Sequence, residues 1–431
     1  MAAPLPLEVT AMTNADAPLI RHTGVSYFPT AFIARLPYAM MVVGVLTLVV
    51  AARGSVGLGG LNSAMVGLGA ACVGPLIGAA ADRFGQRTVV ALTGILNGLV
   101  LGAFAWVVYS SAPDAAVLAL AFVIGATAPQ VAPMSRARLV GIIGARVAPG
   151  RRERTYERTM AYESAADETV FVFGPFLVGI LAAGIAPWAP VVGAGILELV
   201  FVTAFALHPT GAARLLGSAG DRPVGPKREL LRPDLVATVV GIFGVGLFFG
   251  ATLTSLTAFM GDRGAGEQAG LVYGVMGIGS AAFALGVALM PAGFTRRARW
   301  IAFASLMLVG TLALPFVGSV GGMVAALAII GIGVGPTLVT QYAFGGERAP
   351  IGRSATVMTI LGSAIIVGQS LASAITGELA ESVGTGVALW MPAVAAAIVV
   401  GAGIANWKLT PARTAAAVPV PAAEELAARA G

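Results

Sequence analysis

The chain has 431 residues, of which 57% are hydrophobic and 11% are charged, and its formal net charge is +6. A water-soluble domain carries roughly 25% charged residues, so this composition excludes an ordinary soluble protein of this length. The basic residues lie beside long apolar stretches and form no stripe with aromatic residues. This arrangement argues against a nucleic-acid-binding surface and favours anchoring at the anionic headgroups of a lipid bilayer.

Apolar stretches of about 20 residues follow one another along the chain, and each is long enough to cross a bilayer as a helix. The first six cover residues 31–52, 56–80, 88–110, 115–135, 159–184 and 189–208. The second six cover residues 235–260, 269–292, 300–318, 320–344, 354–379 and 385–407. The sequence therefore predicts an all-α integral membrane protein with about twelve transmembrane helices in two six-helix bundles.

The segments outside these stretches predict the domain organisation. The N-terminal segment lacks a basic region followed by an apolar stretch, so no cleaved signal peptide is expected there. Residues 1–30 are predicted to form an N-terminal tail. Residues 209–233, rich in Arg, Gly and Pro, are predicted to form a linker between a bundle at 31–208 and a bundle at 234–407. The Ala- and Pro-rich residues 408–431 are predicted to form a loosely ordered C-terminal tail.

The distribution of basic residues predicts the orientation in the membrane. When the spans alternate in direction, all 26 Lys and Arg residues except Arg53 and Arg263 fall on one side. Basic residues beside short loops stay on the cytoplasmic side. We therefore expect a multi-pass protein of the plasma (inner) membrane whose two termini and linker are cytoplasmic.

Two sequence matches indicate an internal duplication. Residues 124–129 in the fourth span resemble residues 331–336 in the tenth, and the two segments end in Ala-Pro and Gly-Pro. The pair Gly78 and Gly85 matches Gly286 and Gly293 at nearly the same offset. Transporters are commonly built from such repeats, with the substrate between them near the middle of the membrane. Because Gly and Pro are frequent in this chain, a chance match is the alternative.

The most specific motif lies between the second and third spans and reads Gly-Ala-Ala-Ala-Asp-Arg-Phe-Gly-Gln-Arg over residues 78–87. Gly85 permits a tight turn, and Asp82 places an anion where it can face the N-terminus of a neighbouring helix. The alternative is an ordinary charged loop in which Arg83 and Arg87 only fix the topology.

This motif resembles the signature of the major facilitator superfamily, Gly-x-x-x-Asp-Arg-x-Gly-Arg/Gln-Arg/Lys, at Gly78, Asp82, Arg83, Gly85, Gln86 and Arg87. The resemblance implies a secondary transporter with the family's fold over about 31–407. It also implies a cytoplasmic latch in which Asp82 binds the start of the eleventh span, near residues 353–356. The second copy has Met290 opposite Asp82, so we expect the latch on one side only.

Four acidic residues are predicted to lie within the membrane: Glu163, Asp167 and Glu168 in the fifth span and Glu198 in the sixth. We expect no Lys or Arg at their depth, with Arg35, Arg136, Arg138 and Arg158 at the boundary. Such acids point to proton relays, and we assign proton coupling to Asp167 or Glu168. The alternative is structural: Glu163 pairs with Arg136 or Arg138, polar neighbours bind Asp167 and Glu168, and a protonated Glu198 joins two helices. The structural alternative is preferred for Glu163 and Glu198.

Prolines and glycines inside the spans predict bends, because proline leaves a carbonyl group without its helical partner. The positions are Pro129, Gly174, Pro175 and Pro336. In lipid, such bends persist where neighbours or a water-filled cavity satisfy the backbone, although simple packing kinks are the alternative. Antiporters of the resembled family carry a longer fifth-span motif that ends Gly-Pro-x-x-Gly-Gly, which residues 174–179 match only in part.

The resemblance also implies that spans one, four, seven and ten line a central cavity. The candidate residues are Tyr38, Gln130, Phe248, Thr252, Gln341 and Tyr342. Each could instead be a core residue or face lipid. Because this set carries no charge, we expect a neutral or amphipathic organic substrate rather than a dianion.

The sequence argues against an enzyme, since it has neither a phosphate-binding Gly-x-x-x-x-Gly-Lys loop nor a His-Glu-x-x-His motif, and only two histidines. We expect no cofactor and no metal. The favoured function is proton-coupled transport of a small organic molecule by a monomer through alternating access, with export by antiport preferred. Uptake by symport of a metabolite or sugar, a channel, and a membrane scaffold are the alternatives.

Overall fold

The computed structural model describes residues 17–212, 225–264, 269–291 and 293–410, and these residues form helices and connecting turns without a strand. The larger parts of the predicted N- and C-terminal tails, and the middle of the predicted linker, lie outside the described residues. So do the side chains of Glu168 and Pro175.

Among the described residues, twelve helical segments are long and apolar enough to cross a membrane, which confirms the predicted fold class of an all-α membrane protein. They cover Tyr27–Arg53, Leu58–Phe84, Gln86–Val108, Asp114–Arg146, Pro149–Ala182, Ala189–Leu207, Pro233–Gly261, Val272–Leu289, Arg296–Phe316, Val320–Arg348, Ser354–Ser382 and Thr385–Leu409. The first of them begins inside the segment predicted as the N-terminal tail.

The first half of the molecule consists of α2 to α12. Their bounds are α2 Leu19–Thr23, α3 Tyr27–Ile33, α4 Leu36–Arg53, α5 Val56–Phe84, α6 Gln86–Val108, α7 Asp114–Thr127, α8 Val131–Arg146, α9 Pro149–Gly184, α10 Ala189–Leu197, the π-helical turn η1 Glu198–Val202, α11 Thr203–Leu207 and α12 Pro209–Ala212.

The second half consists of α13 to α19, preceded by the short 3₁₀ helix η2. The bounds are η2 Lys227–Leu231, α13 Pro233–Gly261, α14 Ala269–Gly286, η4 Val287–Leu289, α15 Arg296–Leu312, η5 Leu314–Phe316, α16 Val320–Arg348, α17 Ser354–Ser382, α18 Thr385–Ala388 and α19 Met391–Leu409.

Of the positions predicted to bend helices, one interrupts its helix in the structure and others do not. The fourth span is broken into α7 and α8 around Pro129, which fits the loss of a backbone donor at proline. Helix α9 runs through Gly174, and α16 runs through Pro336 without interruption. The break at Pro129 matters for the site, because α8 then starts deep in the bundle and carries its polar residues there.

Small residues allow the helices of each half to approach closely. A Cβ atom added to Gly250 would lie 2.9 Å from the carbonyl carbon of Gln369, and one added to Gly368 would lie 2.8 Å from the backbone nitrogen of Leu247. Helices α13 and α17 are therefore in backbone contact, as small residues permit in membrane proteins.

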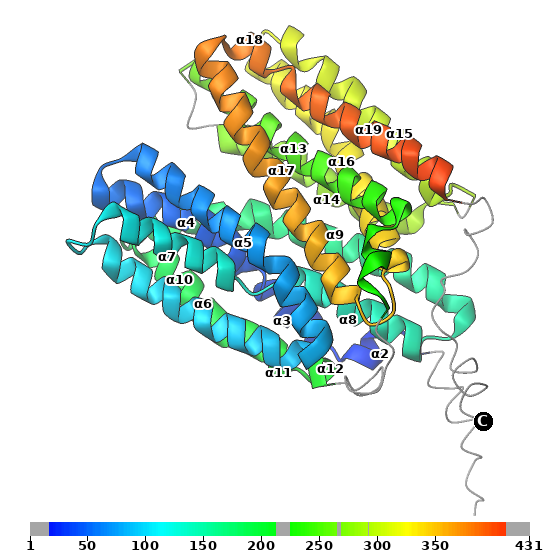
Figure 1. Cartoon of the computed structure of the whole chain (residues 1–431). Helices are drawn as coiled ribbons and strands as arrows, with labels where there is room; N and C mark the ends of the chain where they lie inside the picture. The colour runs from blue at the N-terminus through cyan, green and yellow to red at the C-terminus, as the bar shows by residue number, and fades with distance from the viewer. Residues whose placement is uncertain (1–16, 213–224, 265–268, 292, 411–431) are drawn as a thin grey trace, which may run out of the picture.

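The two halves meet along α5 and α17 and along α9 with α14 and α16. Figure 1 shows the ribbons of the halves converging near α8 and the start of α17 and diverging toward α18. We call the converging end, where Asp82, Tyr156, Arg296 and Ala355 lie, the closed end.

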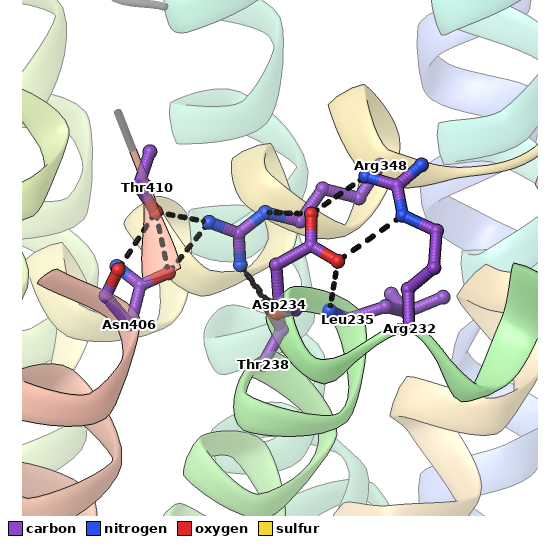
Figure 2. A network of polar contacts seen from close by, with 7 residues as sticks. All are labelled: Arg232, Asp234, Leu235, Thr238, Arg348, Asn406 and Thr410. Atoms are coloured by element: carbon purple, nitrogen blue, oxygen red, sulfur yellow. Dashed lines mark hydrogen bonds and ion pairs between the residues drawn. The ribbon is translucent and has the colours of Figure 1, made fainter. Parts of the chain in front are cut away.

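In each half, a buried arginine at the closed end forms hydrogen bonds with neighbouring segments. In the second half, the Arg348 guanidinium of α16 donates to the Asn406 Oδ1 (2.6 Å) of α19, to the Oγ1 of Thr410 (2.7 Å), which follows α19, and to the Thr238 Oγ1 (2.7 Å) of α13. Figure 2 shows this network, in which Asp234 also pairs with Arg232. In the first half, Arg138 of α8 donates to the Thr210 Oγ1 (3.2 Å).

Candidate functional site

The sequence motif of residues 78–87 forms one of the contacts between the halves at the closed end. The Asp82 carboxylate accepts hydrogen bonds from the backbone N–H groups of Ala355 (3.1 Å) and Thr356 (2.8 Å) and from the Thr356 Oγ1 (2.7 Å). These donors belong to the first turn of α17, whose N–H groups have no partner within the helix. Asp82 thus lies at the position that the resemblance implied.

The other residues of the motif support this contact. Gly78 lies against α17, since a Cβ atom there would be 2.8 Å from the Ala355 carbonyl oxygen. Gly85 has a φ of 91°, a backbone conformation that favours glycine, and it forms the turn between α5 and α6. The Arg83 guanidinium lies 5.3 Å from the ring centre of Phe84, and Arg87 donates to the Leu207 carbonyl oxygen (2.8 Å).

Replacing Asp82 with Asn should weaken the closed end by about 1.5–3 kcal/mol, the usual contribution of hydrogen bonds to a charged group. The amide would also direct its own N–H₂ group at the N–H donors of α17. Spin labels at Phe84 and Ile351, both exposed at the closed end, in a Cys72→Ala background, should report a longer distance. Asp262→Asn, at an exposed residue after α13, is the control and should leave the distance unchanged. An unchanged distance in Asp82→Asn would contradict the role of this carboxylate.

A second group of contacts between the halves was not predicted. Arg296, at the start of α15, forms ion pairs with Glu153 and Glu157 of α9, and Arg299 pairs with Glu157 (2.5 Å). The Tyr156 hydroxyl donates to the Ala343 carbonyl oxygen (2.7 Å). The sequence signal for these contacts is the mixture of acidic and basic residues at 151–158, of which only the basic ones contribute to the predicted orientation.

Deeper in the first half, the buried carboxylate of Glu163 and the partly buried carboxylate of Asp167 form a charged cluster with Arg35 and Arg136. Arg35 pairs with Glu163, and its Nε lies 3.4 Å from Asp167. Arg136 pairs with Asp167 at 2.5 Å. The Glu163 carboxylate also accepts a hydrogen bond from the Ser135 Oγ (3.0 Å). The charges of the two acids and the two arginines balance.

This cluster corrects the expectation that no basic residue would accompany the intramembrane acids. Arg35 lies where the first span is interrupted between α3 and α4, and Arg136 lies in the second turn of α8, after the break at Pro129. The depths of Arg35 and Arg136 cannot be estimated along straight, continuous helices, because such helices contain neither the interruption between α3 and α4 nor the break at Pro129. The structural alternative for Glu163 named the wrong partner, because Arg35 and not Arg136 or Arg138 binds it. Arg138 instead donates to the Phe205 carbonyl oxygen (3.1 Å).

The charged cluster is in contact with the second half of the molecule. The Arg136 guanidinium carbon lies 3.8 Å from the ring centre of Tyr342 in α16. A cation over an aromatic ring is attracted to it, more strongly away from water. The ion pair of Asp167 with Arg136 is therefore directly connected to the contact between the halves.

A cavity of about 110 Å³ lies beside the charged cluster. Its wall comes mainly from the first half, with Tyr342 and three residues of α17 from the second. The lining residues are Ala34, Arg35, Tyr38, Ala39, Pro129, Gln130, Val131, Ala132, Pro133, Arg136, Asp167, Val170, Phe171, Glu198, Tyr342, Gly362, Ile365 and Ile366.

Three of the six predicted cavity residues, Tyr38, Gln130 and Tyr342, line this cavity. The other three, Phe248, Thr252 and Gln341, are buried but are not among its lining residues. The six candidate residues carry no charge, but the wall of this cavity also contains four charged residues, Arg35, Arg136, Asp167 and Glu198. Apolar stretches identify the helices but do not show which face of each helix points inward.

Glu198 differs from the other acids. Its side chain has no exposed surface, and neither carboxylate oxygen has a hydrogen-bond partner among the described residues. The predicted helix-to-helix hydrogen bond of Glu198 is therefore missing from the described contacts. The proposed roles of Asp167 and Glu168 in proton coupling remain predictions.

The two histidines lie at the closed end outside the spans. His208 is within hydrogen-bond distance of the Thr210 Oγ1 (2.9 Å), and burial, followed by the charge of Arg138, lowers the pKa of its ring. Burial likewise lowers the pKa of His22. Both rings therefore favour the neutral form at neutral pH.

Comparisons with known proteins agree with this architecture. Residues 27–364 match the family model of the Major Facilitator Superfamily. The human organic anion transporter MFSD10 has a similar structure, with a TM-score of 0.68 at 18% identity, over 90% of this chain and 100% of that one. The proton:xylose symporter XylE has a TM-score of 0.65 at 15% identity, over 90% and 96% of the two chains.

A bacterial homologue of the iron transporter ferroportin, in an outward-facing state with soaked iron, has a TM-score of 0.64 at 13% identity and covers 94% of this chain and 99% of its own. A search among curated proteins gives no match. At these identities the structural similarity concerns the fold.

Proposed function

Because this chain belongs to the Major Facilitator Superfamily, we propose that it is a proton-coupled secondary transporter of a small organic molecule, working by alternating access as an antiporter. The two halves rock around the cavity between them. The closed end faces the cytoplasm of the cell, in line with the basic residues at that end. The observation that carries this proposal is the cavity, whose wall holds carboxylates next to the contact between the halves.

Proton coupling is assigned to Asp167 within the charged cluster. A proton on this carboxylate removes its charge and breaks its pairing with Arg136. The Arg136 guanidinium, which lies on Tyr342, is then free to take a new position. Since this contact joins α8 to α16, the protonation state of Asp167 biases the arrangement of the halves. A ligand or proton shifts such an equilibrium only through unequal affinity for the two states.

The experiment begins with a thermal-shift screen of the purified protein against metabolites and drugs to find a ligand. That ligand is then added outside proteoliposomes that contain a pH indicator. An antiporter makes the lumen more alkaline, because protons leave as the ligand enters. Asp167→Asn should reduce this proton movement at least about tenfold, because the amide cannot titrate and leaves Arg136 unpaired. Glu378→Gln, at an exposed acid near the end of α17, is the matched control.

Unimpaired proton movement in a monodisperse Asp167→Asn protein would reject the assignment to Asp167. The absence of proton movement with any transported ligand in the unmodified protein would reject proton coupling itself.

A second candidate, symport of an organic anion with a proton, is supported by the two arginines in the cavity wall. Protonation of Asp167 would release a guanidinium that could bind a carboxylate. The structurally similar MFSD10 is described as an organic anion transporter and XylE as a proton symporter. In the proteoliposome experiment, symport gives the opposite sign, because the lumen becomes more acidic as the ligand enters.

A further inference from the structure

We propose that Glu198 binds a positively charged group of the transported molecule, so that the substrate is an organic cation with an apolar body. The inference rests on the proposed antiport function and names its substrate class. In addition to the proton assigned to Asp167, Glu198 would carry either the cationic group or a proton of its own, and the exchange of one for the other would add to the coupling of substrate and proton movement.

The first argument is the environment of the carboxylate. The Glu198 side chain is 0% exposed, it lines the cavity, and both of its oxygens lack a partner among the described residues. Burying an ionised carboxylate without a partner costs several kcal/mol or more. Either a proton or a cation held in the cavity removes this cost. Ionisable residues at such depth in a membrane protein commonly mark substrate or ion pathways.

The second argument is the backbone at this position. Glu198 is the first residue of η1, a π-helical turn between α10 and α11. Single π-helical turns inside α-helices are rare and occur frequently at functional sites. The turn changes the direction of the side chains that follow it along the sixth span.

The third argument is the charge balance of the surrounding groups. In the cavity wall, the charges of Arg35 and Arg136 are already balanced by Glu163 and Asp167. Glu198 has no ion pair among the described residues. An anionic ligand would therefore meet arginines whose charges are already balanced and an additional acid, whereas a cation would meet one carboxylate without a counter-charge.

The helices that pack against Glu198 carry few titratable groups that could balance the charge of its carboxylate in place of a bound cation. Helix α3 contributes Tyr27, whose hydroxyl is within hydrogen-bond distance of the Ser135 Oγ (2.9 Å). Helix α6 has Arg87 as its only titratable residue, and that side chain bonds the Leu207 carbonyl oxygen at the closed end. Helices α10 and α11 contain none. On the other side of the cavity, α4 contributes Tyr38.

The remaining wall suits an apolar body with a cationic end. Besides Tyr38, it includes Val170, Phe171, Ile365 and Ile366. Aromatic rings attract cations, and apolar side chains hold hydrocarbon. In the exchange, the cation enters, the Glu198 carboxyl group releases its proton to water on the side where the cavity opens, and the carboxylate pairs with the cation.

The test measures binding of benzyltrimethylammonium to the purified full-length protein by calorimetry at pH 8 and pH 5.5. Its charge is permanent, so any pH dependence comes from the protein. We expect binding to weaken by up to about tenfold for each pH unit in the range where the proton competes. Neopentylbenzene, which has the same shape without the charge, should bind with no such pH dependence.

Variants test whether the pH dependence of cation binding comes from Glu198. Glu198→Gln should weaken binding of the cation at pH 8 at least about tenfold and remove the pH dependence, because the amide holds no charge. Glu198→Asp should keep the pH dependence, and Glu378→Gln should match the unmodified protein. If Glu198→Gln does not fold, the comparison of the cation with its neutral analogue in the unmodified protein still decides the question.

Equal binding of the cation at both pH values, or unchanged binding in a folded Glu198→Gln variant, would overturn the inference. Proton-driven transport of neutral or anionic molecules only, with no cation bound, would also overturn it while leaving the proposed function in place. Proteoliposomes that move no protons with any ligand would instead reject the proposed function.

Discussion

Replacing Arg348 with methionine lowers the free energy of unfolding by about 3–5 kcal/mol, the usual cost of removing one partner from a buried ion pair. Arg348 joins α13, α16 and α19 through Thr238, Asn406 and Thr410 and lies 3.7 Å from the Asp234 carboxylate (Figure 2). Methionine fills a similar volume and supplies none of these donors, so several buried acceptors lose their partner.

The measurement is the midpoint of thermal unfolding in detergent, which should fall by several degrees. Arg228→Met removes an exposed arginine close to the same end of the second half and should change the midpoint little. Equal midpoints for the Arg348→Met and Arg228→Met proteins would show that the network contributes no net stability.

Replacing Gly78 with valine opens the closed end. A Cβ atom at this position would lie 2.8 Å from the Ala355 carbonyl oxygen and 3.0 Å from the Cβ of Thr359, so α5 and α17 must separate. Overpacking of this kind costs about 1–3 kcal/mol. The cost applies only while the closed end stays closed, so the equilibrium shifts by roughly 5- to 150-fold toward the open arrangement.

The spin-label pair at Phe84 and Ile351 measures this shift as a larger population of long distances. Gly60→Val is a matched control, because it makes the same substitution in the same helix at a position where no atom lies within 4 Å of the added Cβ. If the two valine variants gave the same distance distribution, the close contact of α5 with α17 would not control opening.

The fold could be predicted from the sequence because its main signals are local. Each span is visible as an apolar stretch, and the family motif at Gly78 to Arg87 identifies the architecture. The position of Asp82 at the start of α17 also follows from that resemblance. These features depend on composition and on short spacings, which a single sequence contains in full.

The candidate site could be predicted only in part, because it depends on contacts between distant residues. The pairing of Arg35 with Glu163 joins residues of two different spans. It requires an interruption after α3 that the apolar stretch does not show. Likewise, Phe248 and Thr252 lie on a predicted cavity-lining span, but the face of α13 that meets α17 cannot be deduced from hydropathy alone.

The contact of Asp82 with α17 has a consequence for the tolerance of this protein to sequence change. Two of its three donors are main-chain N–H groups, which every amino acid except proline supplies. Substitutions at position 355 can thus preserve the bond, provided that they fit, whereas position 82 must keep its carboxylate. The constraint on the side chain therefore falls on one partner of the contact, Asp82 of α5, and much less on the start of α17.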